Sequence, residues 1–362
     1  MSPVPGRRGP GNPEGVPRSN RTLEAPPDPR PTLEQVAALA GVSRATVSRV
    51  VNGSPGVSPV VRAQVERAVA KLGYVPNRAA RSLVTRRADS VALVVSEPHA
   101  RFFSEPFFAG MVRGVSGVLA ETGVQLLLLI AQDLPNRGRL ERYVVGGHVD
   151  GVLLASVHGD DPLPAVLERA GVPAVLVGRP AAPPSASYVD ADNRGGARAA
   201  VGHLAGRGRR RIATITGPLD MGVGLDRLDG YRDGLAAAGL DADPGLVEPG
   251  DFTEEGGAAA TARLLERPGP PVDAVFAASD LMAAGALRAL RAAGRRVPED
   301  VAVVGFEDSA VARYAQPPLT TVRQPIEEMG RQATRLLLAT MAGEAGGMHL
   351  ILDTELVVRA ST

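Results

Sequence analysis

The stretch TLEQVAALAGVSRATVSRVVNG, residues 32–53, predicts two short helices joined by a tight turn. Thr32 and Gln35 have the spacing at which each side chain satisfies a free backbone N–H at the start of a helix. Gly41 ends this first helix, and Ser43 is placed to cap the next one after a turn of three residues. Two helices joined so closely cross steeply, so we predict a helix-turn-helix motif.

The second of these helices, residues 44–52, has two different faces. Its valines recur at the three- and four-residue steps that place side chains on one side of a helix, and they predict a buried face. These valines are Val47, Val50 and Val51. The opposite side is left to contact another molecule. It carries Arg44, Ala45, Ser48 and Arg49.

A third helix is predicted over residues 58–73, SPVVRAQVERAVAKLG. Ser58 is a helix cap, Pro59 suits the first helical position, and Gly73 ends the helix. The apolar positions of this helix face inward and complete one small core with the first two helices. They are Val61, Val65, Ala68, Val69 and Leu72.

Length and composition bound the class of protein. A chain of 362 residues is expected to form two or three domains. The longest strongly apolar run, residues 124–131, is far shorter than the roughly 20 residues of a membrane helix, so we expect no membrane partner. Cysteine is absent, which excludes disulfides, thiolate metal sites and a cysteine nucleophile. No signal-peptide pattern opens the chain, and we expect a cytoplasmic protein.

Basic charge is concentrated near the amino terminus. Residues 31–89 carry nine basic and three acidic side chains, although the net charge of the whole chain is only +1. This pattern is typical of a module that binds a polyanion such as DNA, and the alternative is a solvated basic face. The proline-rich residues 1–30 predict a disordered leader. Residues 77–89 predict a short basic helix or a flexible linker.

Beyond residue 90, strands rich in Val and Leu alternate with helical segments, which predicts an α/β core of doubly wound parallel sheets. The predicted strands lie at residues 91–95, 124–130, 150–156, 172–178, 211–217, 272–279 and 301–306. Their number predicts two subdomains with a cleft between them. We place the first at about residues 90–190 and 322–347, and the second at about 191–321 and 348–362. Ligands of such sheets bind beyond the carboxyl ends of the strands.

Several motifs occur together and in order: TLEQVAALAGVSRATVSRVVNG, GYVPNRAARSL, GDFTEEGG, SDLMAAGAL, and PEDVAVVGFEDS followed by PPLTTVRQP. Over residues 32–359 the chain resembles the lac repressor family of bacterial transcription regulators. The resemblance implies a homodimer with a three-helix DNA-binding head (31–76), a hinge helix (77–89) and a core (90–362) like the periplasmic sugar-binding proteins. It also implies repression of a palindromic operator under the control of a small effector, such as a sugar.

The resemblance assigns Arg44, Ala45 and Arg49 to base edges in the major groove. Each arginine can grip guanine with two hydrogen bonds, and the alanine methyl suits thymine. Short polar residues suit phosphate oxygens, with helix capping and solvation as the alternative. They are Thr32, Ser43, Thr46, Ser48 and Asn52. In the hinge the resemblance implies Asn77, Arg81 and Leu83 as DNA contacts, with the leucine wedged into the minor groove at a flexible pyrimidine–purine step.

For the effector site, the resemblance implies an arginine, carboxylates and aromatic side chains, which suit a polyhydroxylated ring. The residues are Phe107, Phe108, Arg227, Phe252, Ser279, Asp280 and Glu307. Asp280 is also a possible helix cap, and Phe252 a possible core residue. Glu307 stands where many relatives carry aspartate, and Ser279 where many carry asparagine, so the effector is expected to differ from theirs.

Three other classes of protein are alternatives to such a repressor. An enzyme is disfavoured because the chain has no G-x-S-x-G, P-loop or H-E-x-x-H motif, and its five histidines show no metal spacing. We expect no cofactor. A transport binding protein is disfavoured by the helix-turn-helix head. The alternative kept open is a regulator of the same fold that responds to a nucleoside, to another metabolite or to a protein corepressor.

Overall fold

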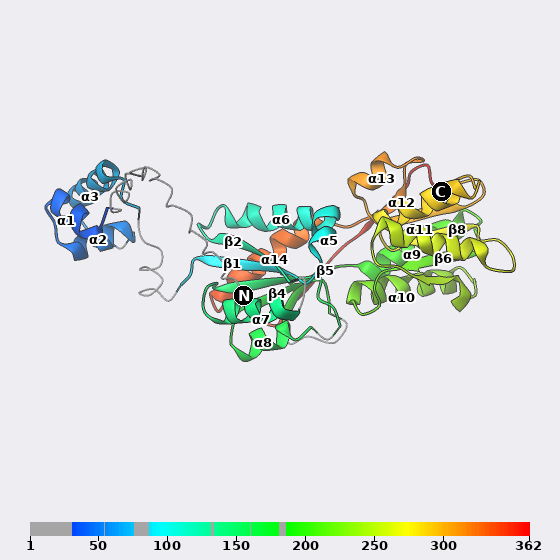
Figure 1. Cartoon of the computed structure of the whole chain (residues 1–362), viewed down its shortest axis with the longest axis horizontal. Helices are drawn as coiled ribbons and strands as arrows, with labels where there is room; N and C mark the ends of the chain where they lie inside the picture. Colours follow the sequence, from blue (N-terminus) through cyan, green and yellow to red (C-terminus); the bar gives the residue numbers. More distant parts are fainter. Residues whose placement is uncertain (1–30, 54, 76–86, 132–133, 160, 181–185) are drawn as a thin grey trace, which may run out of the picture. The chain divides into compact units, whose positions relative to one another are not determined.

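The computed structural model describes residues 31–53, 55–75, 87–131, 134–159, 161–180 and 186–362 (Figure 1). The predicted leader and most of the predicted hinge, including Asn77, Arg81 and Leu83, lie outside these residues. The chain divides into two compact units, residues 1–78 and 79–362.

The head contains the three predicted helices: α1 (Leu33–Ala40), α2 (Arg44–Val51) and α3 (Pro59–Leu72). The reciprocal cap of α1 is confirmed, because Gln35 N donates to Thr32 Oγ1 at 3.3 Å and Thr32 N donates to Gln35 Oε1 at 2.8 Å. Gly41 ends α1 in the left-handed region, at φ 65°, which only glycine adopts readily. The turn between α1 and α2 is therefore set by local sequence.

One small apolar core holds the three helices of the head together. Val36 from α1, Val47 from α2 and Val65 from α3 are fully buried at its centre. Of the inward positions predicted for α3, Val69 and Leu72 are partly buried at the edge of this core. The predicted two-faced pattern of α2 is thus confirmed, with its valines inside.

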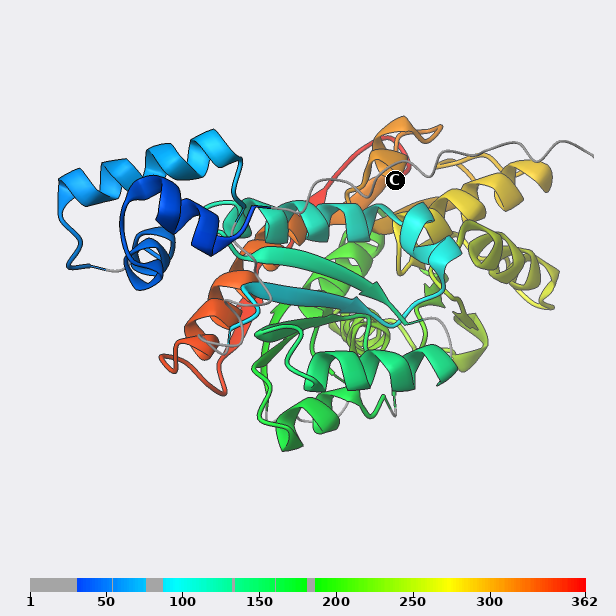
Figure 2. The ribbon, with the colours of Figure 1, turned by 60° about the vertical axis from the view of Figure 1, so that its left-hand side comes forward.

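The first sheet of the larger unit has six parallel strands in the order β11-β5-β4-β3-β1-β2. They are β1 (Ser90–Val95), β2 (Gln125–Ile130), β3 (Gly151–Ala155), β4 (Ala174–Val177), β5 (Ser187–Ala191) and β11 (His349–Leu352). Helices cover both faces of this sheet, as Figure 2 shows. They are α5 (His99–Ser104), α6 (Pro106–Leu119), α7 (Leu134–Val145), α8 (Leu163–Arg169) and α14 (Ile326–Met341).

The side chains of β1 point alternately to the two faces of the sheet, and each face is covered by its own layer of helices. Val91, Leu93 and Val95 pack with α6 and α14 on one face, whereas Ala92 and Val94 pack with α7 and α8 on the other. Because neighbouring side chains of a strand point to opposite faces, a strand covered on both sides reads as a continuous apolar run. This is the pattern from which the strand was predicted.

The second sheet has the order β12-β10-β9-β8-β6-β7 and is parallel except for β12. Its strands are β6 (Ile212–Thr216), β7 (Val247–Pro249), β8 (Ala274–Ala277), β9 (Ala302–Glu307), β10 (Thr320–Arg323) and β12 (Glu355–Val357). Its helices are α9 (Asn193–Gly206), α10 (Gly222–Ala237), α11 (Glu254–Glu266), α12 (Asp280–Ala292) and α13 (Ala310–Tyr314), with a 3-10 turn at Pro244–Leu246. α9 and α10 cover one face, and α11 and α12 cover the other.

The chain passes between the two sheets after β5, after β10 and after β11. The last two crossings differ from the expected boundaries. β10 belongs entirely to the second sheet, so the expected start of the returning segment at residue 322 falls inside a strand. β11 pairs in parallel with β5 in the first sheet, where Leu350 lies opposite Val189, so residues 349–352 do not belong to the second subdomain. The α/β fold class of two parallel sheets is confirmed.

Within the part of the chain that the structure describes, no helix is both long and apolar enough to cross a membrane.

Candidate functional site

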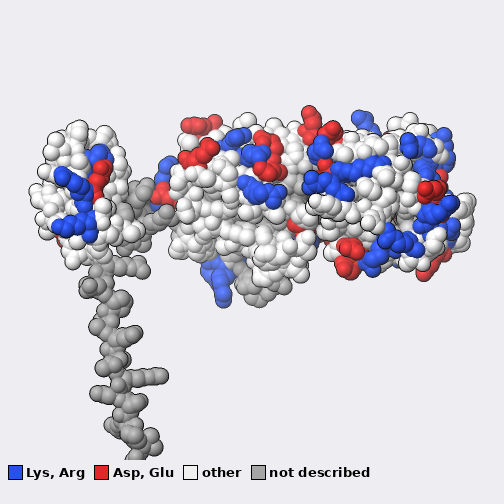
Figure 3. Space-filling view, turned by 90° about the horizontal axis from the view of Figure 1, so that it is seen from above, with Lys and Arg blue, Asp and Glu red and all other residues white. Residues whose placement is uncertain are grey.

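The outward face of α2 presents the side chains that the sequence assigned to DNA. Arg44, Ala45 and Arg49 are exposed, and Thr46 and Ser48 are half-buried beside them. Figure 3 shows basic side chains gathered on one face of the head, with acidic side chains next to them. The apolar face of α2 fixes this orientation, because the valines can be buried only if the arginines point outward.

The short polar residues of the head hold its local structure. Ser43 Oγ caps α2 by accepting from Thr46 N at 3.1 Å, and it lies 2.9 Å from Thr46 Oγ1. Asn52 Nδ2 donates to Ser48 Oγ at 3.2 Å. With Thr32 capping α1, helix capping therefore accounts for part of this polar set. These side chains keep free lone pairs or donors for a second partner.

An ion pair on the head was not predicted from the sequence. Arg44 Nε lies 2.9 Å from Glu34 Oε1, and both side chains are largely exposed. Glu34 is in the first turn of α1, one helix before Arg44, so only the tight turn at Gly41 brings the two together. The pair engages Nε of Arg44, and the two terminal nitrogens of the guanidinium have no partner in this pair.

A cavity in the larger unit lies beyond the carboxyl ends of strands from both sheets. It encloses about 610 Å³ of space, part of it open to solvent. Its walls include residues at the ends of β3, β4, β5, β9 and β10, the position expected for a ligand of open α/β sheets. The lining residues are Arg101, Glu105, Phe107, Ser156, Val157, Val177, Gly178, Arg179, Pro180, Asp190, Met221, Gly222, Val223, Arg227, Phe252, Glu307, Gln324 and Met329.

Four of the predicted effector residues line this cavity: Phe107, Arg227, Phe252 and Glu307. Phe108 does not, because the next residue of a helix points about 100° away, and it is buried in the core of the first sheet. The prediction for Phe108 is therefore corrected.

Ser279 and Asp280 also lie outside the lining. Ser279 is the cap of α12, since its Oγ accepts from Met282 N at 3.2 Å. Asp280 is fully buried and accepts from Thr321 Oγ1 at 2.6 Å and from Ser309 N at 2.7 Å, which ties α12 to β10 and the loop after β9. Burial raises the pKa of Asp280 to about 6. Both side chains are engaged by other groups of the protein, and their assignment to the effector stays a prediction.

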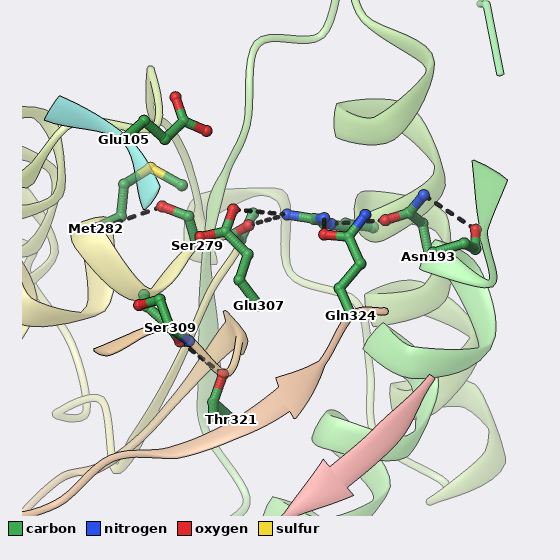
Figure 4. Close-up of polar contacts among 12 residues, drawn as sticks. Glu105, Asn193, Ser279, Met282, Glu307, Ser309, Thr321 and Gln324 are labelled. Carbon is green, nitrogen blue, oxygen red and sulfur yellow. Dashed lines mark hydrogen bonds and ion pairs between the residues drawn. The ribbon is translucent and has the colours of Figure 1, made fainter. Parts of the chain in front are cut away.

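Arg227 is held rigidly at the floor of the cavity. Its Nε donates to Asn193 Oδ1 at 3.0 Å, its Nη2 donates to Gln324 Oε1 at 3.2 Å, and its Nη1 donates to the carbonyl of Ala278. Figure 4 shows Glu307, Gln324 and Asn193 along one line of polar contacts. Burial lowers the pKa of the Arg227 guanidinium, which lies 3.7 Å above the ring of Phe306.

Three carboxylates face the cavity, and two of them were missed by sequence reasoning. Glu105 is paired with Arg101 Nε at 2.9 Å, whereas Glu307 Oε1 lies 4.0 Å from Arg227 Nη1. Asp190 accepts from Ala191 N and Asn193 Nδ2 through one oxygen only. Burial raises the pKa of all three carboxyl groups. Asp190 lies near the carboxyl end of β5, whereas Glu105 precedes α6 and is set apart in the sequence only by the phenylalanines on either side of it.

Backbone strain gathers around the same cavity. Ser156, Phe252 and Glu307 have φ values of 55°, 65° and 113°, in a region that residues other than glycine rarely adopt. The ring of Phe252 fills the space where Gly217 lacks a Cβ, and the Arg101 guanidinium lies 5.1 Å from its centre. Such conformations concentrate at sites that bind or react, since the surrounding fold must hold them in place.

A helix-turn-helix head with an outward basic helix and a two-sheet core around a polar cavity together define a ligand-binding transcription regulator. Two family models agree with these parts: the bacterial regulatory proteins of the lacI family match residues 32–77, and the periplasmic binding protein-like domain matches residues 201–362. The HTH-type transcriptional regulator CelR of Thermobifida fusca is 58% identical over 335 residues, which cover 92% of this chain and 98% of that protein.

Further relatives extend the agreement over most of the chain. The HTH-type transcriptional repressor CytR of Escherichia coli K12 is 34% identical over 340 residues, covering 91% of this chain and 96% of its own length. A solved CelR–cellobiose complex has 56% identity and a TM-score of 0.75, covering 92% and 100% of the two chains. The lac repressor dimer bound to operator and an anti-inducer has 28% identity and a TM-score of 0.81, covering 92% and 99%. The chain belongs to the lacI family of bacterial transcription regulators.

Proposed function

We propose that this protein is a homodimeric repressor whose affinity for a palindromic operator is set by a sugar in the cavity, with cellobiose or a related disaccharide as the effector. The observation that carries the proposal is the cavity itself. An arginine, carboxylates and the Phe252 ring surround it, and these groups suit hydroxyl pairs and the apolar face of a sugar ring. The CelR–cellobiose complex, at 56% identity, supports this choice of sugar.

The exposed face of α2 supports the DNA-binding half of the proposal. Arg44 and Arg49 read guanines in the major groove, and Ala45 contacts a thymine methyl. The capping residues Ser43 and Thr32, together with Thr46, Ser48 and Asn52, hold phosphate oxygens. The hinge residues are assigned from the sequence alone. Asn77 and Arg81 contact the DNA backbone, and Leu83 opens the central base step of the operator.

The dimer follows from operator symmetry, and the lac repressor dimer among the structural neighbours supports it. A sugar that favours one arrangement of the two subdomains changes operator affinity by linkage, and the operator changes sugar affinity by the same factor. Since its target is DNA, we place the protein in the cytoplasm.

Selection of bound DNA from a random pool, at one fixed salt concentration, tests this function. Salt must be fixed because phosphate contacts make affinity strongly salt-dependent. We expect a palindrome with a central pyrimidine–purine step, and an affinity for it that changes about 5- to 150-fold with saturating cellobiose. A palindrome that responds only to a nucleoside would support the alternative effector class. Failure to enrich any palindrome would contradict the operator proposal.

A further inference from the structure

Asp190, at the end of β5, has one carboxylate oxygen that the protein leaves without a hydrogen bond. The residue is 2% exposed and lines the cavity. Its Oδ1 accepts from Ala191 N at 2.9 Å and from Asn193 Nδ2 at 3.0 Å. Its Oδ2 is buried and no well-formed hydrogen bond reaches it from the described residues; the backbone N–H of Arg179 lowers the pKa of this carboxyl group, but burial has the larger effect and raises it. A buried acceptor without a donor is costly, so a donor is expected from outside the protein.

The nearest positive charge at this oxygen does not satisfy it. Arg179 Nε lies 3.9 Å from Asp190 Oδ2, beyond hydrogen-bond distance. The same guanidinium is already engaged by Asp226 through Nη2. The Asp190 carboxylate is also fixed in direction, because Asn193, which holds its other oxygen, accepts in turn from Arg227 Nε at 3.0 Å. Asp190 Oδ2 is therefore a rigid, open acceptor.

Unlike Asp190 Oδ2, the arginines that line the cavity are already paired with other groups of the protein. Arg101 pairs with Glu97 at 2.7 Å and with Glu105 at 2.9 Å. Arg179 pairs with Asp226, and each of the three guanidinium nitrogens of Arg227 donates to a protein group. A phosphate group is usually held by cationic donors turned toward it. Here each guanidinium already donates to protein partners, and its remaining N–H groups can serve sugar hydroxyls.

We infer that Asp190 Oδ2 accepts a hydrogen bond from a hydroxyl of the bound sugar and that Asp190, together with Glu307, makes the cavity select uncharged sugars over their phosphorylated forms. This inference rests on the proposed function. Glu307 lies at the same cavity: its carboxyl group is 4.0 Å from Arg227 Nη1 and makes no hydrogen bond to the residues that the structure describes, so it is free to exchange a hydrogen bond with a sugar hydroxyl. A hydroxyl can donate to Asp190 Oδ2, whereas a phosphate dianion carries no hydrogen to donate there and leaves this oxygen unpaired.

Titration calorimetry on the full-length protein tests the inference, with cellobiose and cellobiose 6′-phosphate as ligands. We expect the wild type to bind cellobiose at least tenfold more tightly than its phosphate. Asp190→Asn is expected to bind cellobiose at least tenfold more weakly and to lose most of the discrimination against the phosphate. Asp233→Asn is the matched control, because that carboxylate is exposed and pairs with Arg194 at 2.6 Å on the surface. It is expected to bind like the wild type.

A series of monodeoxy cellobioses separates a direct contact from a structural effect of Asp190→Asn. One missing hydroxyl should weaken binding to the wild type and make no difference to the variant, because its acceptor is already gone. If every deoxy sugar loses the same factor in both proteins, Asp190 does not accept from the sugar. If the wild type prefers the phosphate, the charge selection is wrong. If the wild type binds neither sugar, the proposed function and this inference both fail.

Discussion

His158 Nδ1 lies 2.8 Å from Asp220 Oδ2, and this hydrogen bond joins the loop after β3 to the loop after β6. The two loops belong to different sheets, so the contact bridges the subdomains. A second bond lies beside it, from Gly159 N to the carbonyl of Asp220 at 2.8 Å. The other ring nitrogen of His158 lies 3.1 Å from Oε1 of the buried Glu97. Residues on both sides of this contact, Val157 and Met221, line the cavity, so it helps to hold the cavity closed.

This contact makes stability depend on pH. The hydrogen bond to Glu97 raises the pKa of His158, and the bond to Asp220 adds to it. A histidine with a raised folded-state pKa stabilises the fold fully below its unfolded pKa of about 6.5, and the effect is lost as pH rises through the folded value. His158→Gln should therefore lower the unfolding temperature more at pH 6 than at pH 9.

The unfolding temperatures of the wild type and His158→Gln, each measured at pH 6 and pH 9, test this prediction. His148→Gln is the control, because His148 stacks on Tyr143 with its ring 4.6 Å away and is exposed. An equal loss of stability at pH 6 and pH 9 would show that protonation of His158 does not contribute.

Arg49 is expected to read sequence rather than only add charge. Arg49→Ala should cost about 1–3 kcal/mol of discrimination between the operator and a site changed at one guanine. Arg67→Ala, on α3, removes the same charge from another exposed position and should weaken both DNAs about equally. Fluorescence anisotropy with the two DNAs at fixed salt gives the comparison. Equal losses for both DNAs in Arg49→Ala would reassign Arg49 to phosphate.

Glu34 is expected to compete with DNA for Arg44. An exposed ion pair of this kind is worth about 0–1 kcal/mol, so Glu34→Gln should strengthen operator binding by up to about fivefold. Glu66→Gln, an equal charge change on α3, gives the gain from charge alone. The difference between the two variants is the contribution of the Arg44 pair. Weaker operator binding in Glu34→Gln would mean that Glu34 positions Arg44 for the base instead.

Asp280 is expected to stabilise the fold without touching the ligand. Asp280→Ala leaves the Thr321 hydroxyl and the Ser309 N–H without their acceptor, at a cost of about 1–3 kcal/mol in unfolding free energy. Urea denaturation measures this loss. Calorimetry with cellobiose well below the unfolding temperature should give the wild-type affinity. A stable variant with lost affinity would restore Asp280 to the effector site.

The parts of the fold that local chemistry determines could be predicted from the sequence. Thr32, Ser43, Gly41 and Gly73 act within a few residues of their own position, and the boundaries of the head helices follow from them. Buried strands such as β1 are apolar on both faces and stand out for that reason.

Other strands were not predicted because their sequences carry little of this signal. β5 is SYVDA and β10 is TTVR, short segments that contain polar residues inside the fold, such as Thr321, which donates to Asp280. β11 follows a glycine-rich segment and has three exposed residues, so nothing local assigns it to the first sheet.

The cavity was predicted only in part, because its walls come from segments far apart in the chain. Arg227 and Phe252 lie in motifs that point to them directly. Asp190 does not, since its open oxygen is apparent only once Asn193 and Arg179 are seen around it. Phe107 and Phe108 are adjacent in sequence, and only the packing of α6 determines which one lines the cavity.

The most direct test of the account is the operator affinity of the full-length protein measured with and without saturating cellobiose, at one salt concentration. Coupling between the cavity and the head predicts a change of at least fivefold. It also predicts that Asp190→Asn needs at least ten times more cellobiose for the same change. An operator affinity that stays constant while calorimetry shows the cavity filled with cellobiose would contradict the account.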